Sequence, residues 1–179
     1  MVDRAPTWVG VDVGLKRDST AVAWTQRRPD GRAHVAVRIW QPRRDGSLET
    51  SDVMAFLRQL ALTFDVKEIA YDPRLFEVAG AQLEDEGLPM AETPRSPERM
   101  TPIVGAAYDA IRRKEMTHDD DREFERHVLA AVTRPNERGF TISKARSRDK
   151  IDAAIAMCLA LHAIELPPEP TVKPWIFWE

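Results

Sequence analysis

The sequence has little cysteine, no long apolar run and no excess of positive charge. Its one cysteine, Cys158, lies in an apolar run, so we expect a buried thiol without an internal disulfide, in a reducing compartment. No segment approaches the ~20 apolar residues of a membrane-spanning helix, and the polar start of the chain differs from a signal peptide. The formal net charge of −3 excludes bulk electrostatic attraction to nucleic acid, so such binding would need local basic patches.

The 179 residues are nevertheless sufficient for one domain with its own hydrophobic core. Hydrophobic residues make up 43% and charged residues 31% of the chain, which is typical of globular proteins. We expect the domain to cover residues 1–166, with a proline-rich, aromatic tail over residues 167–179. The tail contains Trp175-Ile-Phe-Trp178, which favours docking either on the domain or on a partner.

One stretch near the start organises the rest. Val9, Val11 and Val13 alternate with glycine and Asp12, and this period of two predicts a strand. A carboxylate inside an apolar strand must be paired, hydrogen-bonded or bound to a metal, because burying it alone is costly. The flanking glycines allow a bulky group to approach the backbone. The acid is therefore our first candidate metal ligand.

The remaining pattern predicts an α/β fold with a mixed central sheet flanked by helices. Two strands, joined by an Asp-Gly turn, complete a three-strand antiparallel meander and are expected at 21–26 and 33–40. Further short strands are expected at 66–72 and 89–92. Helices are expected at 50–64, 76–86, 96–113, 122–132 and 147–165. We expect a polar break at 115–121 and a turn with a short hairpin at 135–141.

Two more aspartates are candidates to join Asp12. Pro73 cannot continue a strand, so Asp72 should lie at the carboxyl end of one. Asp152 lies in Lys150-Ile-Asp-Ala-Ala-Ile-Ala156, at the margin of a buried helix face. Carboxylates from distant segments suit Mg²⁺ or Mn²⁺, and two such ions would activate water and stabilise the leaving oxygen of a phosphodiester. From spacing alone, three structural acids explain the pattern equally well.

Nearby polar residues each have two interpretations. Asp149 either adds a metal ligand or caps the last helix, and the cap is favoured. Asp18 and Glu77 either reach the site or are solvated, and solvation is favoured for Asp18; we expect His118 and His127 at the surface. Basic residues that could bind phosphate without reading sequence are Lys16, Arg17, Arg95, Arg99, Arg112 to Lys114, Lys144, Arg146, Arg148 and Lys150. The run from Lys144 to Lys150 is the best candidate, because it directly precedes Asp152 and would line the rim of the cleft; a solvated loop is the alternative.

Four segments, in this order, resemble the nuclease domain of tailed-bacteriophage terminase large subunits. They are Gly10-Val-Asp-Val-Gly14 with Ser19-Thr-Ala-Val, then Tyr71-Asp-Pro73, then Met116-Thr-His-Asp-Asp-Asp121 and its following helix, then Lys150-Ile-Asp-Ala-Ala-Ile-Ala156. The resemblance spans Trp8 to Ala163. It implies an RNase H-like fold and an acidic triad of Asp12, Asp72 and Asp152 that binds two divalent cations, Mg²⁺ or Mn²⁺. It also implies cleavage of double-stranded, concatemeric viral DNA during genome packaging.

The resemblance implies partners as well: an ATPase domain or motor, the small terminase subunit and the portal, in the cytoplasm of a bacterial host. The sequence has no Gly-x-x-x-x-Gly-Lys-Ser/Thr loop, the phosphate-binding signature of such an ATPase. We therefore expect an isolated nuclease domain. The run of acids at 119–121 is not explained by the resemblance.

Three other functions stay open at this point. The Gly10-Val-Asp-Val-Gly14 segment also resembles the first phosphate-binding hairpin of actin, Hsp70 and sugar kinases, although those phosphotransferases contain two copies of the core. A Holliday-junction resolvase would share the same fold. A non-catalytic docking domain of a packaging complex would use the acids only structurally, which their matching contexts disfavour.

Overall fold

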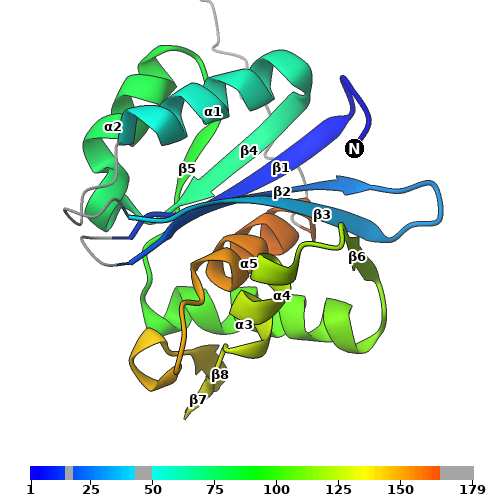
Figure 1. The fold of residues 1–179 in the computed structure, drawn as a ribbon, viewed down its shortest axis with the longest axis vertical. Coiled ribbons are helices and arrows are strands. Elements are labelled where there is room, and N and C mark those ends of the chain that lie inside the picture. The colour runs from blue at the N-terminus through cyan, green and yellow to red at the C-terminus, as the bar shows by residue number, and fades with distance from the viewer. Residues whose placement is uncertain (15–17, 43–49, 166–179) are drawn as a thin grey trace, which may run out of the picture.

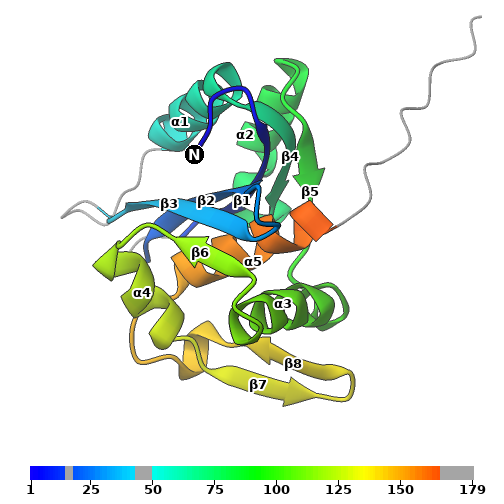
Figure 2. The ribbon, with the colours of Figure 1, turned by 90° about the vertical axis from the view of Figure 1, so that its right-hand side faces the viewer.

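The computed structural model describes residues 1–14, 18–42 and 50–165. These residues form three layers, with helices α1 and α2 on one face of a sheet and α3, α4 and α5 on the other (Figures 1 and 2). The expected mixed α/β fold is confirmed. Lys16, Arg17 and the aromatic tail lie outside the described residues, and the expected domain boundary stays a prediction.

The elements alternate along the chain after an initial run of strands. The six strands of the main sheet are β1 (Pro6–Asp12), β2 (Thr20–Arg27), β3 (Ala33–Trp40), β4 (Asp65–Tyr71), β5 (Met90–Glu92) and β6 (Met116–His118). A separate hairpin consists of β7 (Thr133–Asn136) and β8 (Gly139–Ile142). The helices are α1 (Thr50–Thr63), α2 (Pro73–Asp85), α3 (Pro97–Arg112), α4 (Arg122–Leu129), the 3₁₀ turn η1 (Lys144–Arg146) and α5 (Asp152–Glu165).

The main sheet has the order β5-β4-β1-β2-β3-β6. Strands β1, β2 and β3 form the predicted antiparallel meander, and β4 pairs in parallel with β1. The expected polar break at 115–121 is wrong in part, because β6 pairs in parallel with β3 through three residues. A strand of three residues is too short to show a period of two, so its backbone pairing left no signal in the sequence.

Three helix boundaries also differ from expectation. Helix α2 begins at Pro73 because Asp72 caps it, accepting the backbone N–H of Arg74 at 3.1 Å. Helix α4 ends at Leu129, which is 85% exposed, rather than at residue 132. Helix α5 begins at Asp152 rather than residue 147, because a 3₁₀ turn and an extended segment precede it.

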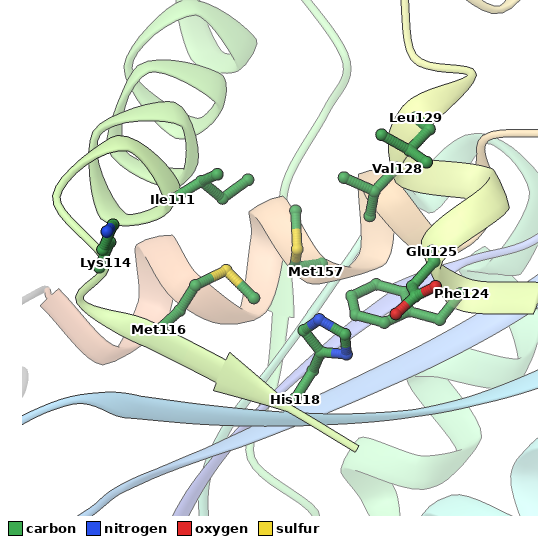
Figure 3. A pocket seen from close by; sticks show the side chains of 9 residues that line it. All are labelled: Ile111, Lys114, Met116, His118, Phe124, Glu125, Val128, Leu129 and Met157. Carbon is green, nitrogen blue, oxygen red and sulfur yellow. The ribbon is translucent and has the colours of Figure 1, made fainter. Parts of the chain in front are cut away.

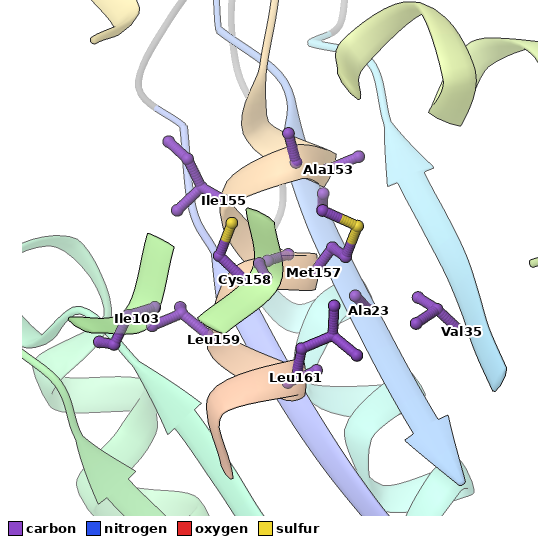
Figure 4. Close-up of a cluster of buried hydrophobic side chains, with 14 of the residues drawn as sticks. Ala23, Val35, Ile103, Ala153, Ile155, Met157, Cys158, Leu159 and Leu161 are labelled. Carbon is purple, nitrogen blue, oxygen red and sulfur yellow. The ribbon is translucent and has the colours of Figure 1, made fainter. Parts of the chain in front are cut away.

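Helix α5 lies against the sheet and forms the centre of one of two buried hydrophobic clusters (Figure 4), the other of which lies under α1 and α2. All of its 14 residues are buried except His162 and Glu165. A Cβ at Gly10 would lie 2.1 Å from the carbonyl oxygen of Ala156, so the bulky neighbour expected beside this glycine is α5. Cys158 is buried as predicted, and burial raises the pKa of its thiol to about 12. No helix within the described residues is long and apolar enough to span a membrane.

Candidate active site

The carboxyl ends of β1 and β4 bring two of the predicted acids to the same edge of the sheet. Asp12 is the last residue of β1 and Asp72 directly follows β4, and the preceding residues Val11 and Tyr71 are register partners. The backbone N–H of Gly14 donates to Thr20 Oγ1 at 3.0 Å, which ties the end of β1 to the start of β2. In α/β sheets, ligands usually bind at such carboxyl ends.

The amino end of α5 brings the third acid, Asp152, to the same place. Ser19, at the start of β2, donates its hydroxyl hydrogen to Asp152 Oδ2. The side chains of Asp12 and Asp152 are both 0% exposed. Residues 140 positions apart in the sequence are therefore joined through contacts with the same lysine, Lys144.

Two cations link these carboxylates. The ammonium of Lys144 contacts Asp12 at 3.2 Å and Asp18 at 2.9 Å, and also contacts Asp152. The guanidinium of Arg95 contacts Asp12, and its Nε lies 3.2 Å from Asp72 Oδ2. Four carboxylates thus face two cations, which leaves a formal excess of two negative charges.

Burial and charge oppose each other at the cluster. Burial alone raises the pKa of Asp152, but the charge and hydrogen bond of Lys144, with hydrogen bonds from Ser19 and Asp18, lower it overall. Burial also lowers the pKa of Arg95, while the negative charge of Asp152 acts in the opposite direction. At both Asp152 and Arg95, charges of opposite sign therefore act against the effect of burial.

A cavity of about 740 Å³ opens beside this network. Asp18, Asp72, Arg95 and Lys144 line it, together with Glu77. The two cations therefore contact both the cavity and the fully buried Asp12. A substrate in this cavity would meet Lys144 and Arg95 before it met the deepest carboxylate.

The carboxylate oxygens of the cluster are suitable ligands for a divalent cation. In this structure they contact the two basic side chains, Lys144 and Arg95, instead. Carboxylate oxygens are the preferred ligands of Mg²⁺ and Mn²⁺. Within the described residues, neither oxygen of Asp12 accepts a hydrogen bond, and both contact cations. As now placed, no three Asp, Glu, His or Cys side chains of that part of the chain converge as metal ligands. A metal would therefore have to compete with Lys144 and Arg95.

Other predicted site residues lie elsewhere. Asp149 lies before the first residue of α5 and not in its first turn, where the cap was expected. Its side chain is half exposed, and its carboxylate lies 3.4 Å from the guanidinium of Arg126. Lys150 donates to Gln41 Oε1 at 2.6 Å rather than to the acids. The sequence had not distinguished Arg95 from the other arginines, because no local pattern connects it to the three acids.

The histidine and acid run between β6 and α4 is structural in part. Asp121 caps α4, accepting the backbone N–H groups of Glu123 and Phe124 at 2.8 and 3.0 Å. Asp119 Oδ1 lies 3.2 Å from His34 Nε2. The expected surface position of His127 is wrong: it is 1% exposed, and burial lowers its pKa although the charge of Asp152 opposes this. The helical periodicity of α4 places His127 on the same face as Phe124, and this could have indicated that His127 is buried.

A second pocket, of about 370 Å³, lies between α3, α4, α5 and β6 (Figure 3). Its lining is mainly apolar and includes Met116, Phe124 and Met157. The ring of His118 is edge-on to that of Phe124, with the ring centroids 5.4 Å apart. The carboxylates around Lys144 are not among its lining residues. It therefore lacks the cluster of oxygen donors that distinguishes the first cavity.

Comparison with known proteins identifies related domains. A model of the family described as "Terminase large subunit, endonuclease domain" matches residues 35–166. The large terminase of bacteriophage HK97 is 18% identical with a TM-score of 0.80, over 91% of this chain but only 40% of that protein. The large terminase nuclease of thermophilic phage G20c is 14% identical over 90% of this chain and 84% of that one, with TM-scores of 0.70 for the magnesium-bound and 0.68 for the cobalt-bound structure. No protein with a curated description matches the sequence.

Proposed function

The chain belongs to the family of terminase large subunit endonuclease domains, which have an RNase H-like fold, and on this premise we propose that it is a metal-dependent endonuclease. Its substrate would be double-stranded, concatemeric viral DNA, cleaved during genome packaging. It would act in the cytoplasm of a bacterial host, alongside an ATPase domain or motor, a small terminase subunit and a portal. The chain spans two fifths of the HK97 protein, so the activity of the whole terminase is itself part of the proposal.

One observation carries this proposal. Asp12 and Asp152 are fully buried at the carboxyl end of the sheet, where two cations from other segments compensate their charge. A buried carboxylate network of this kind is costly for stability, and an apolar pair of similar size would avoid that cost. Metal binding next to a large cavity accounts for its presence.

We propose that Asp12, Asp72 and Asp152 would hold two Mg²⁺ or Mn²⁺ ions. Magnesium and cobalt occur in structures of the similar G20c nuclease. Bound there, the ions would supply the activated water and stabilise the leaving oxygen of the phosphodiester. The side chain of Asp18, which shares Lys144 with Asp12, is an additional oxygen donor at the cavity.

The two cations would then act on the substrate. Lys144 and Arg95 lie on the cavity side of the acids, so charge compensation by metal would free them to contact a DNA phosphate. Arg146, Arg148 and Lys150 follow Lys144 in the chain and would extend this contact along the backbone. Lys16 and Arg17, outside the described residues, are further proposed contacts. Because the net charge is negative, binding by the isolated chain should be weak and sensitive to salt.

Plasmid cleavage tests the proposal directly. The purified protein is incubated with supercoiled plasmid and Mn²⁺, Mg²⁺ or EDTA, alongside Asp12→Asn and the surface control Asp109→Asn. Asp109 lies on α3 and is half exposed, and its carboxylate is 4.0 Å from the guanidinium of Arg113. Its substitution therefore removes a charge without affecting the site. We expect metal-dependent linearisation that Asp12→Asn lowers at least about tenfold and Asp109→Asn leaves unchanged.

The alternatives give different outcomes. Cleavage that survives Asp12→Asn in a folded protein would contradict the assigned site. Preference for four-way junctions over linear duplex would favour a resolvase. No cleavage with any metal, in a protein whose circular dichroism matches a folded domain, would contradict an independent nuclease and favour a docking domain.

A further inference from the structure

His127 makes a contact that connects α4 to the amino end of α5. Its ring Nδ1 accepts the backbone N–H of Ala153 at 3.1 Å, across 26 positions of sequence. Ala153 directly follows Asp152 and lies in the first turn of α5. A backbone group adjacent to a proposed metal ligand is therefore held by a side chain from another helix.

The first N–H groups of any helix lack partners within that helix. In many helices a serine, threonine or aspartate just before the first turn accepts one of them. In α5, the acceptor for Ala153 is instead the buried imidazole of His127. The acceptor lies in the rigid interior, which restricts the position of the first turn more than a flexible surface cap would.

The same ring has an unpaired polar atom. Because Nδ1 accepts, the ring hydrogen is on Nε2, and Nε2 is buried without a hydrogen-bond partner among the described residues. A buried, unpaired N–H is unfavourable, and an apolar side chain of similar volume would not have one. The histidine is therefore explained by what Nδ1 does for α5 rather than by packing alone.

The carboxylate of Asp152 is held from other directions. Ser19 donates to one oxygen and Lys144 contacts the other, while His127 fixes the backbone one residue later. We propose that His127 is a positioning residue that sets the amino end of α5, and through it Asp152, for metal binding. This inference rests on the proposed function, because it assigns the contact a role in holding a metal ligand. Partners beyond the ligands themselves commonly change metal affinity 10- to 100-fold.

Two substitutions at this position separate the acceptor from the bulk of the ring. His127→Leu keeps a similar volume and removes the acceptor. The variant loses the buried, unpaired N–H at Nε2, but the backbone N–H of Ala153 becomes unpaired in its place. Its melting temperature should therefore stay within about 3 °C of the wild type. His127→Asn places an amide oxygen near the position of Nδ1 but leaves a small cavity, so it should lower the melting temperature and keep the contact.

Binding of Mn²⁺ alone, measured by calorimetry on the full chain, is the readout. We expect His127→Leu to weaken Mn²⁺ binding about tenfold or more and His127→Asn to bind within about threefold of the wild type. Phe124→Leu is the matched control, since Phe124 is also buried on α4 but contributes no acceptor. It should lower the melting temperature without changing Mn²⁺ affinity.

Each result supports or overturns the inference. Equal Mn²⁺ binding by His127→Leu and the wild type would overturn it while leaving the proposed function intact. An equal loss in Phe124→Leu would also overturn it, because the effect would then be packing of α4. A folded wild-type protein that binds no Mn²⁺ would overturn the proposed function and this inference together.

Discussion

Helix α5 has an ion pair at each end, and the two pairs differ in burial. At the amino end, Asp152 is 0% exposed and contacts Lys144. At the carboxyl end, Glu165 pairs with Arg27 at 2.7 Å, and both side chains are close to half exposed or more. An exposed pair stabilises a protein by about 0–1 kcal/mol, whereas a buried carboxylate is costly unless its partners remain.

This difference in burial indicates that the amino end of α5 serves the proposed site, whereas the rest of the helix serves the fold. Between its ends α5 is apolar and presses on β1 at Gly10, so the same packing fixes both ends. Only the amino end combines buried charge with a cavity. Substitutions along α5 and its neighbours can therefore break the fold, the site or neither.

The largest effect is expected where the helix meets the sheet. Gly10→Ala would place a methyl group 2.1 Å from the Ala156 carbonyl oxygen and 2.8 Å from the Ala160 nitrogen. Because these are backbone atoms, the helix must shift, and we expect a loss of about 3 kcal/mol or more in the free energy of unfolding. Denaturation with urea measures this loss, which should affect both ends of α5 together.

Gly105→Ala is the matched control for this substitution. Gly105 lies in α3, where an added Cβ would meet no atom within 4 Å. Alanine favours helix over glycine, so this variant should gain roughly 0.5–1 kcal/mol. Similar stability of the two variants would contradict the close approach of α5 to β1.

A smaller and more local effect is expected at the two ion pairs. Lys144→Met removes the cation that contacts Asp12, Asp18 and Asp152 and that a metal would have to displace. We expect Mn²⁺ to bind about tenfold more tightly, a change of ~1.4 kcal/mol. Calorimetry on the wild type and the variant measures the change directly.

Arg27→Met gives the corresponding change at the other end of α5. It removes the partner of Glu165, an exposed pair, so stability should change by less than about 1 kcal/mol and Mn²⁺ affinity should not change. Unaltered or weaker Mn²⁺ binding by Lys144→Met would show that this lysine does not compete for the metal site.

The sequence alone predicted one part of this comparison well. Asp12 stood out because an acid interrupts an apolar pattern, although it ends β1 instead of lying inside a strand. Asp72 stood out because a proline follows it, and the structure places it directly after β4, as predicted. These signals are local, since each depends on residues within a few positions. Asp152 was a weaker candidate, because the periodicity of the last helix placed it only at the margin of a buried face, and the resemblance supported it.

The long-range contacts were not predictable from the same signals. Lys144 contacts Asp152 only eight positions later in the chain, but its contacts with Asp12 and Asp18, and those of Arg95 with Asp12 and Asp72, join distant segments. The local sequence around either cation looks like that of solvated basic residues. His127 was expected at the surface because a lone histidine on a charged helix usually is, yet tertiary packing buries it beside α5. Such contacts arise from the assembly of the layers, which a single sequence does not encode in any short pattern.

The smallest expected effect concerns the pH dependence of stability near the two ends of α5. Burial lowers the pKa of His162 toward the carboxyl end, and lowers that of His127 beside the amino end although Asp152 opposes it. In the unfolded chain both rings should titrate near pH 6.5. Below that pH the unfolded state therefore binds more protons than the fold, so the stability contributed by the neutral rings is complete above pH 6.5 and decreases on acidification through the folded pKa values.

Urea denaturation at steps between pH 8 and pH 5 tests this with His162→Gln and His127→Asn. Each variant should lose stability less steeply below pH 6.5 than the wild type, by up to about one proton in the slope, while the curves stay parallel above it. Both substitutions should flatten the curve, because burial lowers the pKa of each ring. A slope below pH 6.5 that neither variant changes would contradict the uptake of protons by these rings on unfolding.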